Sequence, residues 1–126
     1  MAFKIEKAKT RTTPLVLVDE EKGYIRLEGE SYLEDITSFY KDINEWLKAY
    51  LLTDFTTLTF DCEMEYFNSS TTKQIYNMLR IMDKYASGKS VSVNWIVNAT
   101  NDMLIECGED FREDLEVLEF NIVIKN

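Results

Sequence analysis

Residues 58–66 read LTFDCEMEY, so that apolar and polar side chains alternate almost without a break. This period of two is typical of a β-strand with one face in the core and the other in water. The apolar face is predicted to carry Leu58, Phe60, Cys62, Met64 and Tyr66, and the polar face Thr59, Asp61, Glu63 and Glu65. A strand covered by helices on both faces reads instead as a continuous apolar run. The alternation therefore predicts a sheet whose helices lie mainly on one side.

An amphipathic helix is predicted on each side of this strand. Before it, apolar side chains recur at steps of three and four, at Ile36, Phe39, Tyr40, Ile43, Trp46, Leu47 and Tyr50. Ser31 and Glu34 have the spacing of a capping box, and Glu34 with Asp35 places negative charge at the start of the helix. After the strand, a second helix has its apolar side at Ile75, Met78, Leu79, Met82 and Tyr85, and Gly88 is expected to end it.

The rest of the chain extends the same architecture outward. Two β-prone runs form a predicted hairpin around Gly23, and a strand, a short helix and a final strand follow the second helix. These segments are Leu15–Val18, Tyr24–Glu28, Val91–Val97, Leu104–Phe111 and Phe120–Ile124. Strands joined through helices pair in parallel, whereas the hairpin is antiparallel. We therefore predict a mixed sheet in the order β-β-α-β-α-β-α-β.

Composition and charge exclude several classes of protein. With 126 residues, 45% of them hydrophobic, 4 glycines and 1 proline, residues 1–126 are expected to form a single domain. The net charge of -9 would repel a phosphate backbone, which argues against nucleic-acid binding, and the sequence contains no run of about 18 apolar residues that would predict a membrane span. The basic segment Met1–Arg11 is expected to be a solvated terminus. Two distant cysteines, without a signal-like start, favour a reduced cytoplasmic protein.

The absence of histidine limits the chemistry of the chain. It excludes Ser-His-Asp and Cys-His catalysis and the usual zinc ligand sets, so no metal or cofactor is expected. Two carboxylate pairs, Glu63 with Glu65 and Glu109 with Asp110, are the remaining candidates for acid and base, but no neighbouring feature would shift their pKa values. Cys62 has the parity of a small buried hydrophobic residue. The sequence therefore favours a protein that is not an enzyme.

Small polar residues occupy the junction between the central strand and the second helix. They are Asn68, Ser69, Ser70, Thr71 and Thr72. Asn68, Ser69 and Ser70 are each candidates for the N-cap, and Thr71 with Gln74 repeats the spacing of a capping box. Capping uses only part of this run, and the start of a helix favours negative charge. A hydroxyl here is therefore also a candidate acceptor of phosphate.

Short motifs over almost the whole chain form a recognisable set. They are Tyr66-Phe67-Asn68-Ser69-Ser70 with Lys73, Gly29-Glu30-Ser31-Tyr32 with Glu34, Phe39-Tyr40, Trp46, Tyr50, Trp95, Thr13-Pro14 and Gly108-Glu109-Asp110-Phe111. Together they resemble the SiaC family of bacterial regulatory phosphoproteins. That family is similar in turn to the STAS-type anti-anti-sigma factors, whose Asp-Ser-Ser-Gly motif carries a phosphorylated serine at the same helix start. The resemblance implies a STAS-like α/β fold.

The resemblance also implies a partner switch. A dedicated protein kinase phosphorylates a residue after the asparagine, which is Ser69 here, and a PP2C-type phosphatase removes the phosphate. The unmodified form binds and activates a target, a GGDEF diguanylate cyclase, and so raises cyclic di-GMP and favours biofilm growth. The residues expected to contact a partner are Glu65, Asn68, Ser69, Ser70, Thr71 and Lys73.

Departures from the family pattern leave alternatives open. Ser69 stands where threonine is frequent, Leu33 where proline is frequent, and Thr71 where STAS proteins have glycine. One alternative is a STAS anti-anti-sigma factor that binds an anti-sigma kinase and so releases a sigma factor. Another is a small enzyme that uses the carboxylate pairs.

Overall fold

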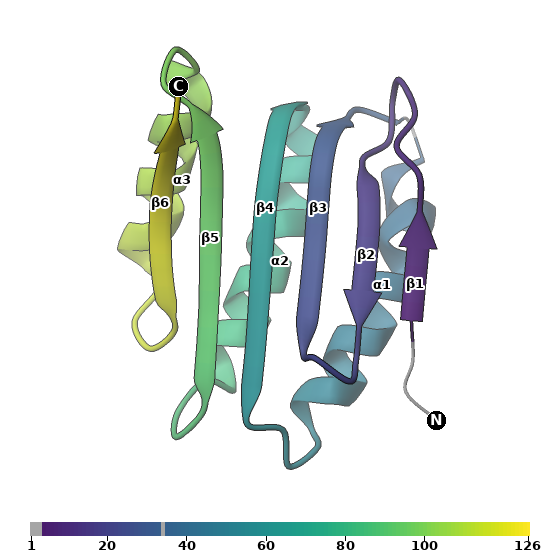
Figure 1. Cartoon of the computed structure of the whole chain (residues 1–126), viewed down its shortest axis with the longest axis vertical. Coiled ribbons are helices and arrows are strands. Elements are labelled where there is room, and N and C mark those ends of the chain that lie inside the picture. The colour runs from purple at the N-terminus through teal and green to yellow at the C-terminus, as the bar shows by residue number, and fades with distance from the viewer. Residues whose placement is uncertain (1–3, 34) are drawn as a thin grey trace.

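The computed structural model describes residues 4–33 and 35–126, which contain one six-stranded sheet and three helices (Figure 1). The strands are β1 (Lys4–Lys7), β2 (Leu15–Asp19), β3 (Tyr24–Ser31), β4 (Thr57–Phe67), β5 (Ser90–Asn98) and β6 (Glu119–Lys125). The helices are α1 (Ile36–Leu51), α2 (Ser69–Lys84) and α3 (Asp102–Asp114). None of the helices in these two ranges is long and apolar enough to cross a membrane.

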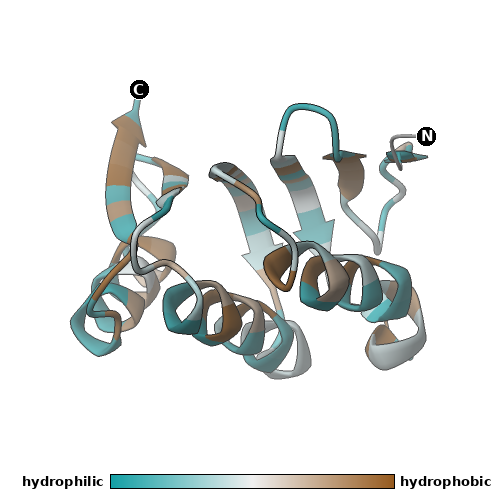
Figure 2. Ribbon diagram, turned by 90° about the horizontal axis from the view of Figure 1, so that it is seen from below, coloured by the Kyte–Doolittle hydropathy of each residue, from teal (hydrophilic) through white to brown (hydrophobic). Residues whose placement is uncertain are grey.

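The strands lie side by side in the order of the chain. β1, β2 and β3 pair antiparallel, whereas β3, β4, β5 and β6 pair in parallel through the three helices. Because each crossover between neighbouring parallel strands has the same right-handed sense, each helix returns to the same face of the sheet. Figure 2 shows α1, α2 and α3 together below the sheet. The predicted mixed sheet with its helices on one side is confirmed.

The predicted order of elements lacks the first strand. Residues 4–7 pair with β2, with Ile5 opposite Val18, although Met1–Arg11 was expected to be a solvated terminus. Ile5 is only 9% exposed and belongs to the hydrophobic core. A strand with a single buried residue gives too short an alternation to recognise, and its pairing depends on β2 rather than on its own sequence.

The core fills the layer between the sheet and the helices. Alternate residues of β3, β4 and β5 are buried, and they meet the apolar stripes of the helices. Trp95, Tyr40 and Phe60 are among the largest fully buried side chains. Each such side chain contributes about 1.5–3 kcal/mol of transfer free energy. The opposite face of the sheet remains polar and open to solvent.

β4 departs from regular alternation near its carboxyl end. The register with β3 moves from Gly29 opposite Met64 to Glu30 opposite Tyr66, so Glu65 is an extra residue in a β-bulge. Tyr66 is consequently 42% exposed, whereas Phe67 is 7% exposed and packs against Trp95. The prediction that Tyr66 lies on the apolar face is therefore wrong, because the bulge exchanges the faces of the last two residues.

The starts and ends of the helices also refine the predictions. α1 is capped by Asp35, whose side chain accepts a hydrogen bond from the Ser38 amide, and not by Ser31, which ends β3. Glu34, the expected second member of that capping box, lies outside the described residues. α2 ends at Lys84, before Gly88, which has a φ of 76° in the following turn.

The carboxylate of Asp83 on α2 binds the turn between α3 and β6 through hydrogen bonds. Asp83 Oδ1 accepts hydrogen bonds from the amides of Val117 (2.8 Å) and Leu118 (2.9 Å), and the Glu116 amide also donates to Asp83. Burial raises the pKa of Asp83, but these amide hydrogen bonds outweigh burial and hold the pKa below its ordinary value of 3.8. A depressed pKa means that the carboxylate stabilises the fold above pH 3.8 and that this contribution is lost as the pH falls further.

We expect Asp83→Asn to lower the free energy of unfolding by about 1 kcal/mol at pH 7, because the amide oxygen accepts the same hydrogen bonds without the charge. The difference from wild type should shrink as the pH falls through the pKa of the folded carboxyl. Urea unfolding of both proteins at pH 7 and pH 3 measures it, with the exposed Asp110→Asn as the control. An equal difference in the free energy of unfolding at pH 7 and pH 3 would contradict the claim that the ionised Asp83 carboxylate causes the difference.

Candidate functional site

The polar run after β4 forms the first turn of α2. Asn68 is the N-cap, with extended backbone (φ -88°, ψ 176°), and its Oδ1 accepts a hydrogen bond from the Thr71 amide at 3.0 Å. Of the N-cap candidates the sequence offered, the structure thus selects Asn68. The Asn68 amide in turn donates to the Ser31 carbonyl (3.2 Å), which joins the start of α2 to the end of β3.

The four hydroxyls of this turn have different environments. Ser69 and Ser70 are exposed at the first helical positions. Thr71 is 0% exposed and donates to the Ser31 carbonyl at 2.9 Å, while the Thr72 hydroxyl donates to the Asn68 carbonyl at 3.1 Å. Thr71 was expected to contact a partner, but its side chain belongs to the core and offers no surface for one. The accessible hydroxyls in the turn are those of the two serines.

A buried hydroxyl cluster lies beneath this turn. The Ser31 hydroxyl is 2.9 Å from the Thr71 hydroxyl and 3.0 Å from the Tyr40 hydroxyl, so β3, α2 and α1 meet there. Burial raises the pKa of Tyr40 well above its ordinary value, although the hydrogen bond with Ser31 opposes that effect. All three groups therefore remain neutral donors and acceptors, and they hold the first turn of α2 firmly under the exposed serines.

The other expected contact residues flank the turn. Lys73 is exposed on α2, four residues after Ser69, which is the spacing at which a negative and a positive side chain pair on one helix face. Glu65 is exposed in the bulge of β4, and its carbonyl accepts a hydrogen bond from the side chain of Asn101 (3.1 Å). Asn101 caps α3, so the starts of α2 and α3 lie at the same end of the sheet (Figure 1). Sequence reasoning did not single out Asn101, because its contact with β4 spans a long separation.

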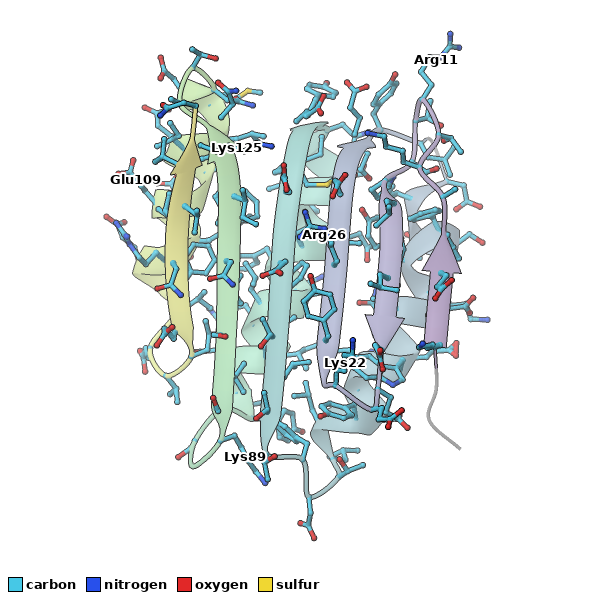
Figure 3. All side chains as sticks on the ribbon, in the orientation of Figure 1. Arg11, Lys22, Arg26, Lys89, Glu109 and Lys125 are labelled. Carbon is cyan, nitrogen blue, oxygen red and sulfur yellow. The ribbon has the colours of Figure 1, made fainter. Side chains whose placement is uncertain are left out.

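The open face of the sheet carries a ladder of charged groups. Arg26 lies at its centre and pairs with Glu28 (2.8 Å) and Glu63 (2.6 Å), and Lys125 reaches from β6 toward β4 to pair with Glu63 (Figure 3). The hydrogen bond from Lys125 holds the pKa of Glu63 below its ordinary value, against a smaller opposing effect of burial and with the help of Arg26. Glu63 is thus a firmly ionised carboxylate.

The carboxylate pairs and the two cysteines show few of the properties that acid-base or thiol chemistry requires. A general acid needs a raised pKa, whereas Glu63 has a lowered one, and Glu109 and Asp110 are exposed on α3. Burial raises the pKa of the Cys62 thiol far above its ordinary range and that of Cys107 to about 11. Cys62 is 1% exposed, which confirms it as a buried hydrophobic residue. Across residues 4–33 and 35–126, no three Cys, Asp or Glu side chains are grouped as a metal site requires.

Comparison with known proteins gives a consistent result. The model of a family described as "SiaC family regulatory phosphoprotein" matches residues 7–125. An uncharacterized protein of Pseudomonas aeruginosa is 27% identical over 106 residues, which cover 83% of this chain and 84% of that protein. The solved structure of SiaC of Pseudomonas aeruginosa is similar with a TM-score of 0.89 and 24% identity, over 98% of this chain and 99% of that one.

A further similar structure contains a partner. It is the crystal structure of the diguanylate cyclase SiaD in complex with its activator SiaC from Pseudomonas aeruginosa. The matched chain has a TM-score of 0.89 and 25% identity, and the match covers 96% of this chain and 99% of that one. The six-stranded sheet with three helices is therefore an architecture already seen in solved structures.

Proposed function

Since the chain belongs to the SiaC family of regulatory phosphoproteins, we propose that it is a non-enzymatic partner switch controlled by phosphate on Ser69. A dedicated kinase adds the phosphate and a PP2C-type phosphatase removes it. The unmodified form binds and activates a GGDEF diguanylate cyclase, which raises cyclic di-GMP. The switch is of the STAS type, in which phosphorylation controls partner choice by one regulatory domain.

One observation carries this proposal. Ser69 is an exposed hydroxyl in the first turn of α2, while the neighbouring hydroxyls of Thr71 and Thr72 are engaged with backbone carbonyls. A visiting kinase therefore meets a serine on a fixed helix start, where backbone amides and the helix dipole tolerate added negative charge. The fold does not need to open for the modification.

The similar structure with a bound cyclase supports the choice of target. In that structure SiaC is the activator of the diguanylate cyclase SiaD, and its chain has the same fold as this one. A cyclase surface that receives the unmodified serine as a small neutral group would have to bury a dianion after phosphorylation. Burial of an unpaired charge costs several kcal/mol, so binding is lost while the fold is kept.

The proposal is tested with the full-length GGDEF cyclase from the same cell. We expect the unmodified chain to raise the rate of cyclic di-GMP formation from GTP severalfold, and the enzymatically phosphorylated chain to leave the rate unchanged. Mass spectrometry of the chain purified from its native cell should locate phosphate on Ser69. An unchanged cyclase rate with the unmodified chain, or phosphate found only on other residues, would overturn the proposal. Release of a sigma factor by the same chain would favour the anti-anti-sigma alternative.

A further inference from the structure

The carboxyl end of β4 presents an aromatic pair beside the acceptor turn. Tyr66 packs edge to face against Tyr32, the residue that follows β3, with ring centroids 5.7 Å apart and an interplanar angle of 68°. Tyr66 is exposed and Tyr32 is half-buried, and only Phe67 and Asn68 separate Tyr66 from Ser69. Tyrosine rings at the surface are frequent anchors of protein interfaces, because they bury a large rigid area at little entropic cost.

The exposure of Tyr66 follows from the backbone. In a regular strand Tyr66 would continue the buried parity of Cys62 and Met64, and it is the extra residue Glu65 that turns the ring into solvent. Bulges commonly redirect one side chain next to a functional site. The chain therefore places an aromatic ring in water at the point where its own alternation would have buried the ring.

Other exposed apolar side chains lie at the same end of the parallel strands. Met103 is 58% exposed in the first turn of α3, and the hydrogen bond from Asn101 to the Glu65 carbonyl holds that turn beside β4. Val123 and Ile124 are exposed near the end of β6. An accumulation of exposed apolar groups at one end of a molecule marks an interaction surface, whereas scattered single residues do not.

A cleft separates β4 from β5 at their carboxyl ends. The pairing of β4 with β5 stops at Cys62 opposite Trp95, although both strands continue further. The lining of the resulting cleft, which has a volume of about 420 Å³, includes Glu63 and Glu65 on β4, Asn101 before α3 and Lys125 on β6. Lys125 already pairs with Glu63 there, whereas no ion pair of the Glu65 carboxylate occurs in the described part of the chain. The cleft therefore already holds the ammonium group of Lys125 beside Glu63, and the Glu65 carboxylate remains available to a cation from a partner.

We infer that this end of β4 is the docking surface for the activated cyclase, with Tyr66 and Tyr32 as the apolar anchor and the cleft at Glu65 as the seat of a basic side chain of that partner. The inference rests on the proposed function and specifies its interface. An arginine suits the cleft, because its planar guanidinium pairs with a carboxylate through two hydrogen bonds. A second copy of this chain fits poorly, since it also carries a net charge of -9.

The test compares variants of the full chain in binding to the full-length GGDEF cyclase. Tyr66→Ala should weaken binding about tenfold or more, and Tyr66→Phe should retain most of the affinity. Glu65→Gln should weaken binding severalfold, with a larger effect at low salt than at high salt. The matched controls are Leu52→Ala, which truncates an exposed side chain at the opposite end of the sheet, and Glu109→Gln on α3 (Figure 3). Both controls should bind as wild type does.

The outcomes separate this inference from the proposed function. If wild type binds the cyclase and Tyr66→Ala and Glu65→Gln bind equally well, the interface lies elsewhere and the inference alone is overturned. If wild type does not bind, the proposed function fails and the inference fails with it. Urea unfolding of each variant shows whether it is folded. If Tyr66→Ala is destabilised, the test depends on the other two variants. Glu65→Gln must then weaken binding, while Tyr66→Phe retains most of the affinity.

Discussion

Gly108→Val is expected to lower the free energy of unfolding by about 3 kcal/mol, because α3 approaches the ring of Trp95 too closely for any side chain at that position. A Cβ atom on Gly108 would lie 2.7 Å from Trp95 Nε1 and still closer to Cδ1 of the same ring. Such contacts force either the helix or the indole to move. The backbone of Gly108 has no positive φ, so the cost arises from space and not from conformation.

The indole has little freedom to move away. Trp95 Nε1 donates a hydrogen bond to the Leu104 carbonyl at 2.8 Å, and the ring packs edge to face against Phe67 and Phe111. Its side chain is 1% exposed. A shift would therefore break a buried hydrogen bond or open a cavity, and each of these costs about 1–3 kcal/mol.

Thermal unfolding provides the measurement for this prediction. For a domain of this size, a loss of about 3 kcal/mol corresponds to a fall in Tm of about 10 °C. Glu109→Val, the matched control on the exposed side of the same helix, should cost only about 0.5 kcal/mol of helix propensity. The milder Gly108→Ala should destabilise wild type clearly and the Trp95→Val background much less, because valine has no Cδ1 or Nε1 atom for the new Cβ to meet. Equal effects of Gly108→Ala in both backgrounds would contradict the steric account.

The elements of this fold that could be predicted are those with many repeats of one pattern. The apolar stripes of α1 and α2 span several turns each, and the alternation before Tyr66 covers most of β4, so periodicity alone located them. Asn68 was one of several equivalent cap candidates, because the residue types at a helix start do not say which of them takes extended backbone. In the structure Asn68 is the cap, and its backbone amide donates a hydrogen bond to the Ser31 carbonyl.

What could not be predicted depends on contacts between distant segments. The bulge at Glu65 shows only in the pairing of β4 with β3. A glycine inside a predicted strand often marks a bulge, and Gly29, which has a φ of 121° in the structure, was the one such signal in the sequence of β3. Ser31 was interpreted as a helix cap from its local spacing, but it bonds to Thr71 forty positions later. Thr71, which was expected to contact a partner, is instead buried beside Ser31. Local spacing cannot distinguish a cap residue from a buried partner of another element.

Phosphorylation of Ser69 is expected to lower the affinity for the cyclase at least about 100-fold while leaving the fold as stable as before or slightly more stable. A loss of 100-fold corresponds to about 2.7 kcal/mol, which lies within the cost of burying an unpaired charge in an interface. Stability should not fall, because Ser69 is exposed at the start of α2, where negative charge contributes about 0.3–1 kcal/mol. Lys73, four residues later on the same helix, adds a small favourable pairing.

Variants separate the effect of the charge from the effect of its position. Ser69→Ala should bind as wild type does, and Ser69→Asp should bind weakly and melt about 2–4 °C higher. Ser87→Asp adds the same charge in the exposed turn after α2 and should leave binding unchanged. Lys73→Ala should remove part of the gain in Tm of Ser69→Asp. Binding is measured by calorimetry with the full-length cyclase, and Tm by circular dichroism.

The combination of the two measurements decides what kind of switch this is. A fall in affinity together with a higher Tm means that phosphate acts at the interface, because a folded chain then presents a surface that the cyclase rejects. A fall in both would mean that phosphate loosens the first turn of α2, which the hydroxyls of Ser31, Tyr40 and Thr71 hold in place. The geometry favours the first result, since the Ser69 side chain points to solvent and takes no part in that buried cluster. Equal affinity of wild type, Ser69→Asp and the phosphorylated chain would remove Ser69 from the switch altogether.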